Sequence, residues 1–98
     1  MYFVYILLSN KDNKLYIGLS EDVHSRFKKH CSGSVESTKN RRPLELIYFE
    51  AYVDHRDAEG REKFLKSGSG HGFLKKQLKH YFEGRFSGVE QPGSSQGS

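Results

Sequence analysis

Residues 2–19 read YFVYILLSNKDNKLYIGL, and this stretch decides the fold. Aromatic and branched residues fill positions 2–8, which is a composition typical of a β-strand. Positions 10–13 hold the turn formers Asn, Lys, Asp and Asn, and apolar residues resume at 15–19. Two short strands joined by a polar turn predict a β-hairpin.

A helix is expected directly after the hairpin. Ser20 has a side chain that can cap the free N–H groups of a helix start. Glu21 and Asp22 would then lie in the first turn, where carboxylates are favourable because the helix dipole is positive there.

The second half of the chain predicts one further strand and two helices. Residues 44–52, LELIYFEAY, have the alternating pattern of a third strand. One helix is expected to begin near Asp54 or Asp57 and to end before Gly68, and the last to run from about residue 71 to 83. The predicted fold class is α+β: a small three-stranded mixed or antiparallel sheet flanked by helices, in the order β-β-α-β-α-α.

Composition predicts one small basic domain. The chain has 98 residues and a formal net charge of +4. We expect residues 87–98, SGVEQPGSSQGS, to be a disordered tail because they offer only one residue to bury. This tail holds one acid and no base, so the predicted domain, residues 1–86, carries +5 and is suited to an anionic partner.

Cysteine use and apolar run length limit the cellular context. The single cysteine, Cys31, excludes an intramolecular disulfide and a zinc site with several cysteines, and it favours a reducing compartment. The apolar run at 2–8 is too short to span a bilayer. We therefore expect a cytoplasmic protein without a membrane anchor.

Glu62 is the most unusual residue of the second predicted helix. It lies four positions after Ala58 and three before Leu65, so it shares the face that should pack inward. A carboxylate there is costly unless it is paired or binds a metal ion. On spacing alone, the favoured explanation is structural: an ion pair with a Lys or Arg side chain, or a place at the edge of the face.

Four polar residues accompany the hairpin and the first helix. Tyr5 and Tyr16 lie on strands predicted to be neighbours, and Arg26 and His30 lie on adjacent turns of one helix. Taken singly, the tyrosines are typical of strand packing and the Arg–His pair of a polar surface.

Together, these residues resemble the GIY-YIG endonuclease family. The resemblance rests on a degenerate first triplet, Val4-Tyr5-Ile6, on the second triplet Tyr16-Ile17-Gly18, and on the spacing of Arg26, His30 and Glu62 after them. The resemblance covers residues 2 to about 80. Within the family, the chain is similar to the small single-domain members and to the nuclease domain of the excinuclease C subunit.

The resemblance implies a metal-dependent phosphodiesterase acting on DNA, in a context of DNA repair or recombination. It implies that Glu62 binds one divalent ion, Mg²⁺ or Mn²⁺, and that Tyr5 helps to activate the attacking water. Tyr16 and Arg26 would hold the phosphate, with His30 beside them. Gly18 would let the backbone approach the phosphate.

Elementary chemistry is compatible with these roles. Mg²⁺ is commonly held by one or two carboxylates with substrate phosphate and water, so Glu62 is sufficient. The guanidinium fork of Arg26 matches phosphate oxygens. The general base stays open at this point: Tyr5 has an ordinary pKa near 10 and needs help, whereas His30 has one near 6.5.

The chain departs from the family pattern at two positions, with Leu19 where many members have Lys and Leu74 where many have Asn. These departures put the rate in question more than the reaction class.

Five basic residues are expected to contact the nucleic-acid backbone, with a solvated surface as the alternative; they are Lys28, Lys29, Lys39, Arg41 and Arg42. DNA is the expected partner and RNA is not excluded. The alternative function is a catalytically weak or inactive nucleic-acid-binding or adaptor module that retains the fold. No sequence feature specifies an oligomeric state.

Overall fold

The computed structural model describes residues 1–87, and the side chains of residues 1–85. The chain divides into two compact units, Met1–Phe64 and Leu65–Ser98. The predicted tail lies outside the described residues, except for Ser87, which ends the last helix.

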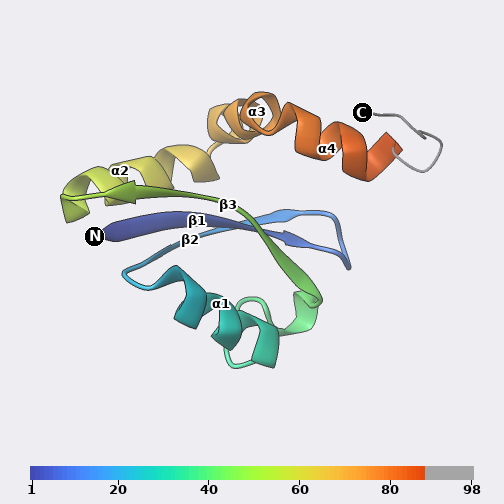
Figure 1. Cartoon of the computed structure of the whole chain (residues 1–98), viewed down its shortest axis with the longest axis horizontal. Helices are drawn as coiled ribbons and strands as arrows, with labels where there is room; N and C mark the ends of the chain where they lie inside the picture. The colour runs from blue at the N-terminus through green and yellow to red at the C-terminus, as the bar shows by residue number, and fades with distance from the viewer. Residues whose placement is uncertain (88–98) are drawn as a thin grey trace. The chain divides into compact units, whose positions relative to one another are not determined.

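The first unit is built on a three-stranded antiparallel sheet (Figure 1). The strands are β1 (Tyr2–Ser9), β2 (Leu15–Ser20) and β3 (Leu44–Tyr52), and β1 lies between the other two. The predicted α+β class and hairpin are confirmed, and the sheet is antiparallel throughout.

The register of the sheet decides which side chains share a face. Tyr5 pairs with Gly18 of β2 and with Phe49 of β3, whereas its neighbour Val4 pairs with Glu50. Successive side chains of a strand point to opposite faces. Tyr5 and Phe49 therefore lie on one face of the sheet, and Val4 and Glu50 on the other.

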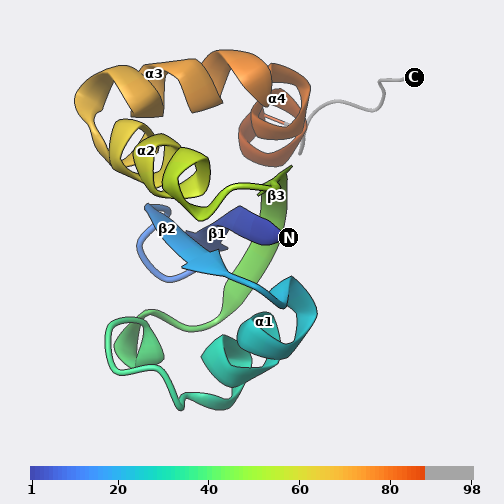
Figure 2. The same cartoon turned by 90° about the vertical axis from the view of Figure 1, so that its left-hand side faces the viewer.

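Helix α1 (Val23–Ser32) covers the face that carries Tyr5, as Figures 1 and 2 show from two sides. The core of this face consists of buried side chains with four partly buried partners; the buried members are Tyr5, Leu7, Val23 and Leu44, and the partners are Phe3, Tyr16, Phe27 and Leu46. Burial of such apolar surface contributes about 25 cal/mol per Å².

The predicted cap of α1 is wrong. Ser20 is the last residue of β2, and its hydroxyl group binds the backbone of Asp22. Asp22 is the N-cap instead, and its carboxylate accepts a 3.0 Å hydrogen bond from the N–H of Ser25. Because the helix begins after the two acids, neither Glu21 nor Asp22 lies in its first turn.

The segment between α1 and β3 is tied to the sheet. Gly33 ends α1 with a positive φ of 84°, and a short 3₁₀ helix follows at Lys39–Arg41. The buried hydroxyl group of Ser9, the last residue of β1, donates a 2.6 Å hydrogen bond to the carbonyl group of Arg41. The segment between α1 and β3 is therefore held near both of its ends.

Helix α2 (His55–Lys66) follows β3, and its start and end are as predicted. Arg61 donates two hydrogen bonds, of 2.8 and 3.0 Å, to the carboxylate of Glu50. The same carboxylate accepts 2.7 Å hydrogen bonds from the hydroxyl groups of Tyr48 and Tyr52. Arg61 of α2 thus reaches the sheet face opposite to the face that carries Tyr5.

In its described residues, the second unit contains two helices, α3 and α4, where the sequence predicted a single helix. Helix α3 spans Gly68–Gln77, and its N-cap is Ser67, whose side chain accepts a 3.1 Å hydrogen bond from the N–H of Gly70. Helix α4 spans Lys79–Ser87. The single helix expected over residues 71–83 is wrong at both ends and at Leu78, which leaves helical geometry at φ −109° and ψ 31°. The apolar spacing continues across Leu78, so it hides the break. No helix in the described part of the chain has the length and apolar character needed to cross a membrane.

Candidate active site

The phenol ring of Tyr5 lies across the backbone of Gly18. A Cβ atom placed on Gly18 would overlap the ring carbon and the hydroxyl oxygen of Tyr5. Because β2 is one of the two edge strands, this arrangement carries the Tyr5 hydroxyl group from the central strand toward that edge of the sheet. The sequence pattern anticipated a close approach at Gly18, but to a phosphate; the structure shows a side chain there.

A chain of two short hydrogen bonds joins Tyr5 to α1 and to the following segment. The hydroxyl group of Tyr5 lies 2.8 Å from Nε2 of His30. On the other side of the ring, Nδ1 lies 2.7 Å from Oγ1 of Thr38. His30 and Thr38 are 0% exposed and Tyr5 is 1% exposed, so both ring nitrogens are committed in the interior of the protein.

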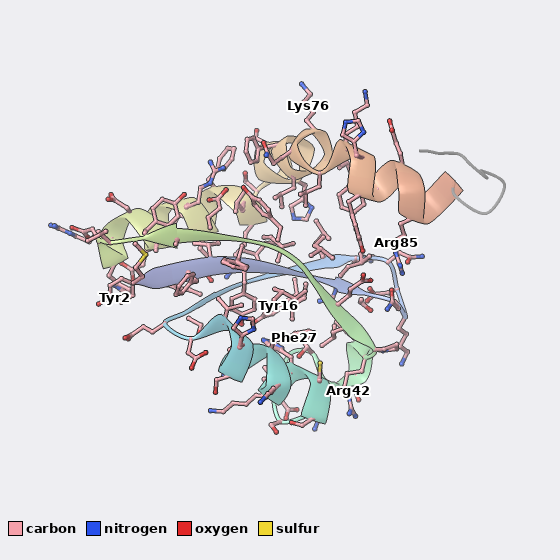
Figure 3. All side chains as sticks on the ribbon, viewed as in Figure 1. Tyr2, Tyr16, Phe27, Arg42, Lys76 and Arg85 are labelled. Atoms are coloured by element: carbon pink, nitrogen blue, oxygen red, sulfur yellow. The ribbon has the colours of Figure 1, made fainter. Side chains whose placement is uncertain are left out.

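Tyr16 completes an aromatic cluster around His30. Its ring centroid lies 5.1 Å from that of His30 and 6.3 Å from that of Tyr5. Tyr5 and His30 are 5.6 Å apart, with the rings close to edge-to-face. Tyr16 and Phe27 lie between the sheet and α1 (Figure 3). The hairpin and the helix therefore bring three predicted site residues into contact.

Arg26 lies one turn before His30 on α1 and acts on both partners of the short hydrogen bond. Burial raises the pKa of Tyr5 above its ordinary value of 10.0, while hydrogen bonding and charge from Arg26 oppose this rise and the neighbouring Tyr16 adds to it. Burial, together with the charge of Arg26, lowers the pKa of His30 to about 4. At neutral pH the His30 ring is therefore neutral and carries one ring proton.

Glu62 lies on α2 and is half-buried. The hydrogen bonds and ring contacts that join Tyr5, Tyr16, His30 and Thr38 to one another do not include Glu62. No group of three or more His, Cys, Asp or Glu side chains in the described part of the chain is placed to hold a metal ion. The structure thus brings four of the five predicted catalytic residues together and leaves Glu62 on a separate helix.

The predicted DNA-contacting residues differ in how they are engaged. Lys28 and Lys29 are exposed on α1. Arg41 forms a 3.0 Å ion pair with Asp12, and Arg42 donates hydrogen bonds to the carbonyl groups of Lys39 and Cys31. Lys39 pairs with Glu36 at 3.2 Å. Three of the five basic residues thus already stabilise the segment that they belong to.

Sequence reasoning missed Thr38. It lies eight residues after His30 in a stretch rich in Ser, Lys and Asn, where one more hydroxyl group carries no signal. Its N–H group donates to the carbonyl group of Val35 at 3.1 Å, which sets the tight turn that brings its side chain under α1. No local pattern at Thr38 could have revealed a contact formed by that turn.

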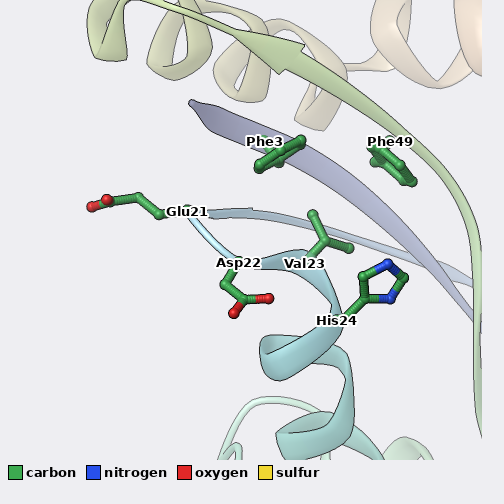
Figure 4. A pocket seen from close by; sticks show the side chains of 6 residues that line it. All are labelled: Phe3, Glu21, Asp22, Val23, His24 and Phe49. Atoms are coloured by element: carbon green, nitrogen blue, oxygen red, sulfur yellow. The ribbon is translucent and has the colours of Figure 1, made fainter.

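A hollow of about 370 Å³ lies beside the start of α1 (Figure 4). Its apolar walls are Phe3, Val23 and Phe49, and its remaining lining residues are Glu21, Asp22 and His24. The rings of Phe3 and Phe49 meet edge-to-face at 5.8 Å. Phe49 pairs with Tyr5 in the sheet, so this hollow lies on the same face as the Tyr5 cluster.

A family model and several known proteins match this chain. The family model described as GIY-YIG catalytic domain matches residues 1–85. A UPF0213 protein of Staphylococcus epidermidis is 43% identical over 67 residues, which are 67% of this chain and 80% of that protein. A UPF0213 protein of Clostridium perfringens is 39% identical over 67 residues, covering 67% and 71% of the two chains.

A solution structure of a UPF0213 protein from Bacillus halodurans aligns with a TM-score of 0.47 and 30% identity, over 97% of this chain and 100% of that one. The match of the family model over residues 1–85, with the two relatives, confirms the resemblance found in the sequence. The chain belongs to the GIY-YIG family.

Proposed function

We propose that this chain is a divalent-metal-dependent endonuclease that hydrolyses phosphodiester bonds in DNA. The observation that carries the proposal is the cluster of Tyr5, Tyr16, Arg26 and His30, in which a buried hydroxyl group, a neutral imidazole and a guanidinium group converge. Structural packing alone does not require a cation beside two tyrosines. A phosphate group does, because its charge must be matched in the transition state.

Each member of the cluster has a distinct part in this proposal. Arg26 holds phosphate oxygens with its planar fork. The hydroxyl group of Tyr16 donates to another phosphate oxygen. The hydroxyl group of Tyr5 orients the attacking water, and as it takes a proton from that water it passes its own proton to Nε2 of the neutral His30, 2.8 Å away.

Glu62 is the proposed ligand of the metal ion, and its donor set fits Mg²⁺ or Mn²⁺. Among the described residues, no group of three or more His, Cys, Asp or Glu side chains could hold a metal ion, and such a donor set does not suit Zn²⁺, which takes three or four protein ligands. Mg²⁺ takes one or two carboxylates and completes its shell with phosphate and water. When bound, such an ion supplies charge that polarises the scissile phosphate.

The test is nicking of supercoiled plasmid DNA with Mg²⁺, with Mn²⁺ or with chelator. We expect Glu62→Gln and Arg26→Ala each to lower the metal-dependent rate at least a hundredfold, because removing one transition-state contact costs about that much. Glu59→Gln on the same helix is the matched control, since Glu59 is exposed and its carboxylate lies 3.6 Å from Nδ1 of His55. Undiminished cleavage by the Glu62 or Arg26 variant would overturn the assignment.

The same assay separates the second candidate, a nucleic-acid-binding module without catalysis. DNA binding with no cleavage of any substrate, in a panel of duplex, branched and single-stranded DNA and RNA, would favour that module. A role in DNA repair or recombination and a cytoplasmic location belong to the proposal.

A further inference from the structure

The carboxylate of Glu50 accepts four hydrogen bonds on its two oxygens. Nε and Nη2 of Arg61 donate at 2.8 and 3.0 Å, one to each oxygen. The hydroxyl groups of Tyr52 and Tyr48 donate to the same two oxygens at 2.7 Å each. Four donors leave the carboxylate little freedom to turn, and the planar fork of Arg61 meets it in one orientation. Glu50 is therefore a fixed point on β3 to which α2 is attached.

This attachment sets the rotation of α2 about its own axis. Ala58 is 0% exposed, so its side of the helix faces inward. Successive residues of an α-helix are about 100° apart, so Arg61 lies about 60° to one side of Ala58 and Glu62 about 40° to the other side. Arg61 and Glu62 thus lie on opposite sides of the buried direction. Fixing the side that carries Arg61 also fixes the side that carries Glu62.

The order of the strands gives these two sides a direction in space. Arg61 lies on the β3 side of α2, because it binds Glu50 of β3. The strand order is β2-β1-β3, so the side that carries Glu62 is turned toward β2. Figure 2 shows the same arrangement, with α2 above β2 and with β3 to the right. The β2 edge of the sheet is the edge toward which the Tyr5 hydroxyl group is directed across Gly18.

We propose that Arg61 is a positioning residue: its two hydrogen bonds to Glu50 rotate α2 so that Glu62 is turned toward the β2 edge of the sheet. The inference rests on the proposed function for the role of Glu62 as a metal ligand, but not for the rotation of α2. It explains how a residue on a separate helix can serve the same site as Tyr5, although they come from elements on opposite faces of the sheet.

The first test needs neither metal nor DNA, because it reads the rotation of α2 itself. A nitroxide is attached at position 62 of the full ¹⁵N-labelled chain through Glu62→Cys, in a Cys31→Ser background. We expect the amide signals of β2 to broaden more than those of β3, since these two strands lie about 10 Å apart and broadening falls steeply with distance. Adding Arg61→Lys, which keeps the cation but loses the fork, should remove this excess.

The matched control is Arg56→Lys on the same helix. Arg56 pairs with Asp54 at 2.8 Å, its side chain is 86% exposed, and this pair does not involve the sheet. The control should leave the excess broadening on β2 unchanged. Equal broadening of β2 and β3 in the labelled chain that retains Arg61, or an excess on β2 that survives Arg61→Lys, would overturn the proposal, whatever the protein cleaves.

The second test is a Mn²⁺ titration of plasmid nicking, which separates positioning from stability. A smaller folded fraction lowers the rate by the same factor at every Mn²⁺ concentration, whereas a misplaced Glu62 raises the concentration that gives half of the maximal rate. We expect Arg61→Lys and Glu50→Gln each to raise this concentration at least tenfold, the usual scale for residues that orient a metal ligand, and Arg56→Lys to leave it unchanged.

The two tests together separate this inference from the proposed function. An unchanged half-maximal Mn²⁺ concentration in Arg61→Lys and Glu50→Gln would refute the positioning role. A labelled chain with the expected broadening, but a wild-type protein that cleaves no DNA at any Mn²⁺ concentration, would refute the proposed function alone.

Discussion

The phenol ring of Tyr5 occupies the space in which any residue other than glycine at position 18 would carry its side chain. The pairing of Tyr5 with Gly18 across the hairpin makes this overlap unavoidable. Gly18 therefore makes room for the ring of Tyr5, whatever role it also has toward a substrate.

We predict that Gly18→Ala displaces Tyr5 and breaks its hydrogen bond to His30. Overpacking of this kind costs about 1 to 3 kcal/mol of unfolding free energy, and cleavage should fall with it. Urea unfolding and plasmid nicking check the two effects. Gly60→Ala on α2 is the control: nothing lies within 4 Å of its added methyl group, so stability should stay the same or rise by up to about 1 kcal/mol. Equal losses in the two variants would contradict the steric argument.

Burial of His30 predicts a loss of stability in mild acid. The pKa of His30 is about 4 in the folded protein and about 6.5 in the unfolded chain, so only the unfolded state binds this proton between those values. Stability should be fully present above pH 6.5 and should fall by on the order of 3 kcal/mol as the pH falls to 4, then change no further through this group. Chemical unfolding at several pH values measures the fall.

His30→Gln is the control for the acid effect, because it cannot titrate. The difference in unfolding free energy between the wild-type protein and this variant, taken at each pH, separates the contribution of His30 from that of the carboxylates. A difference that does not change between pH 7 and 4 would show that the ring is not held neutral.

The carboxylate of Glu50 accepts a network of hydrogen bonds on the other face of the sheet, and we predict that this network stabilises the fold. Burial opposes its ionisation, but hydrogen bonds from Arg61, Tyr52 and Tyr48 prevail and keep the pKa of Glu50 below 4.5. In the same network burial and the Glu50 carboxylate raise the pKa of Tyr48 to about 12. Arg61→Ala leaves a half-buried carboxylate without its cation and should cost about 3 kcal/mol, measured by urea unfolding.

The matched comparison is Arg56→Ala, which breaks the ion pair with Asp54. That pair is exposed, with the Arg56 side chain 86% accessible, and should cost less than about 1 kcal/mol. If Arg61→Ala lowers the unfolding free energy no more than Arg56→Ala does, the Glu50 network does not stabilise the fold.

Two lysines of α1 provide a test of DNA contact. Lys28 and Lys29 are exposed, and Arg26 and His30 of the cluster lie on the same helix. If each contacts one phosphate, Lys28→Gln with Lys29→Gln should lower the slope of log affinity against log salt by about 2 for duplex DNA. Fluorescence anisotropy across a salt series measures the slope. Arg41→Gln should change it less, because Arg41 pairs with Asp12; a reversed order would reassign the DNA-contacting surface.

Sequence patterns predicted the hairpin, the third strand and α2 because their signals are local. Alternation at 44–52 and turn formers at 10–13 each decide their own segment. The cap of α1 could not be decided locally, since Ser20 and Asp22 are both good caps and the extent of β2 chose between them. The break at Leu78 was hidden for a similar reason: the apolar spacing on both sides fits one continuous helix.

The candidate site divides in the same way. The spacing of Tyr5, Tyr16, Arg26 and His30 could be matched to a family pattern, and these residues do meet. Thr38 and the partners of Glu50 could not be predicted, because each depends on contacts between segments that no periodicity encodes. The roles of the site residues, Glu62 among them, stay predictions.

The anchoring of the segment after α1 fixes how many residues this segment can have. The hydroxyl group of Thr38 is hydrogen-bonded to Nδ1 of His30 on α1. Three residues later, the carbonyl group of Arg41 accepts a hydrogen bond from the hydroxyl group of Ser9. An added or deleted residue anywhere between Gly33 and Thr38 would move the hydroxyl group away from the imidazole while leaving every proposed catalytic side chain in the chain. The number of residues in this polar loop therefore decides whether the hydroxyl group of Thr38 can reach the imidazole ring of His30, although none of the residues between them contacts that ring in the hydrogen bonds described.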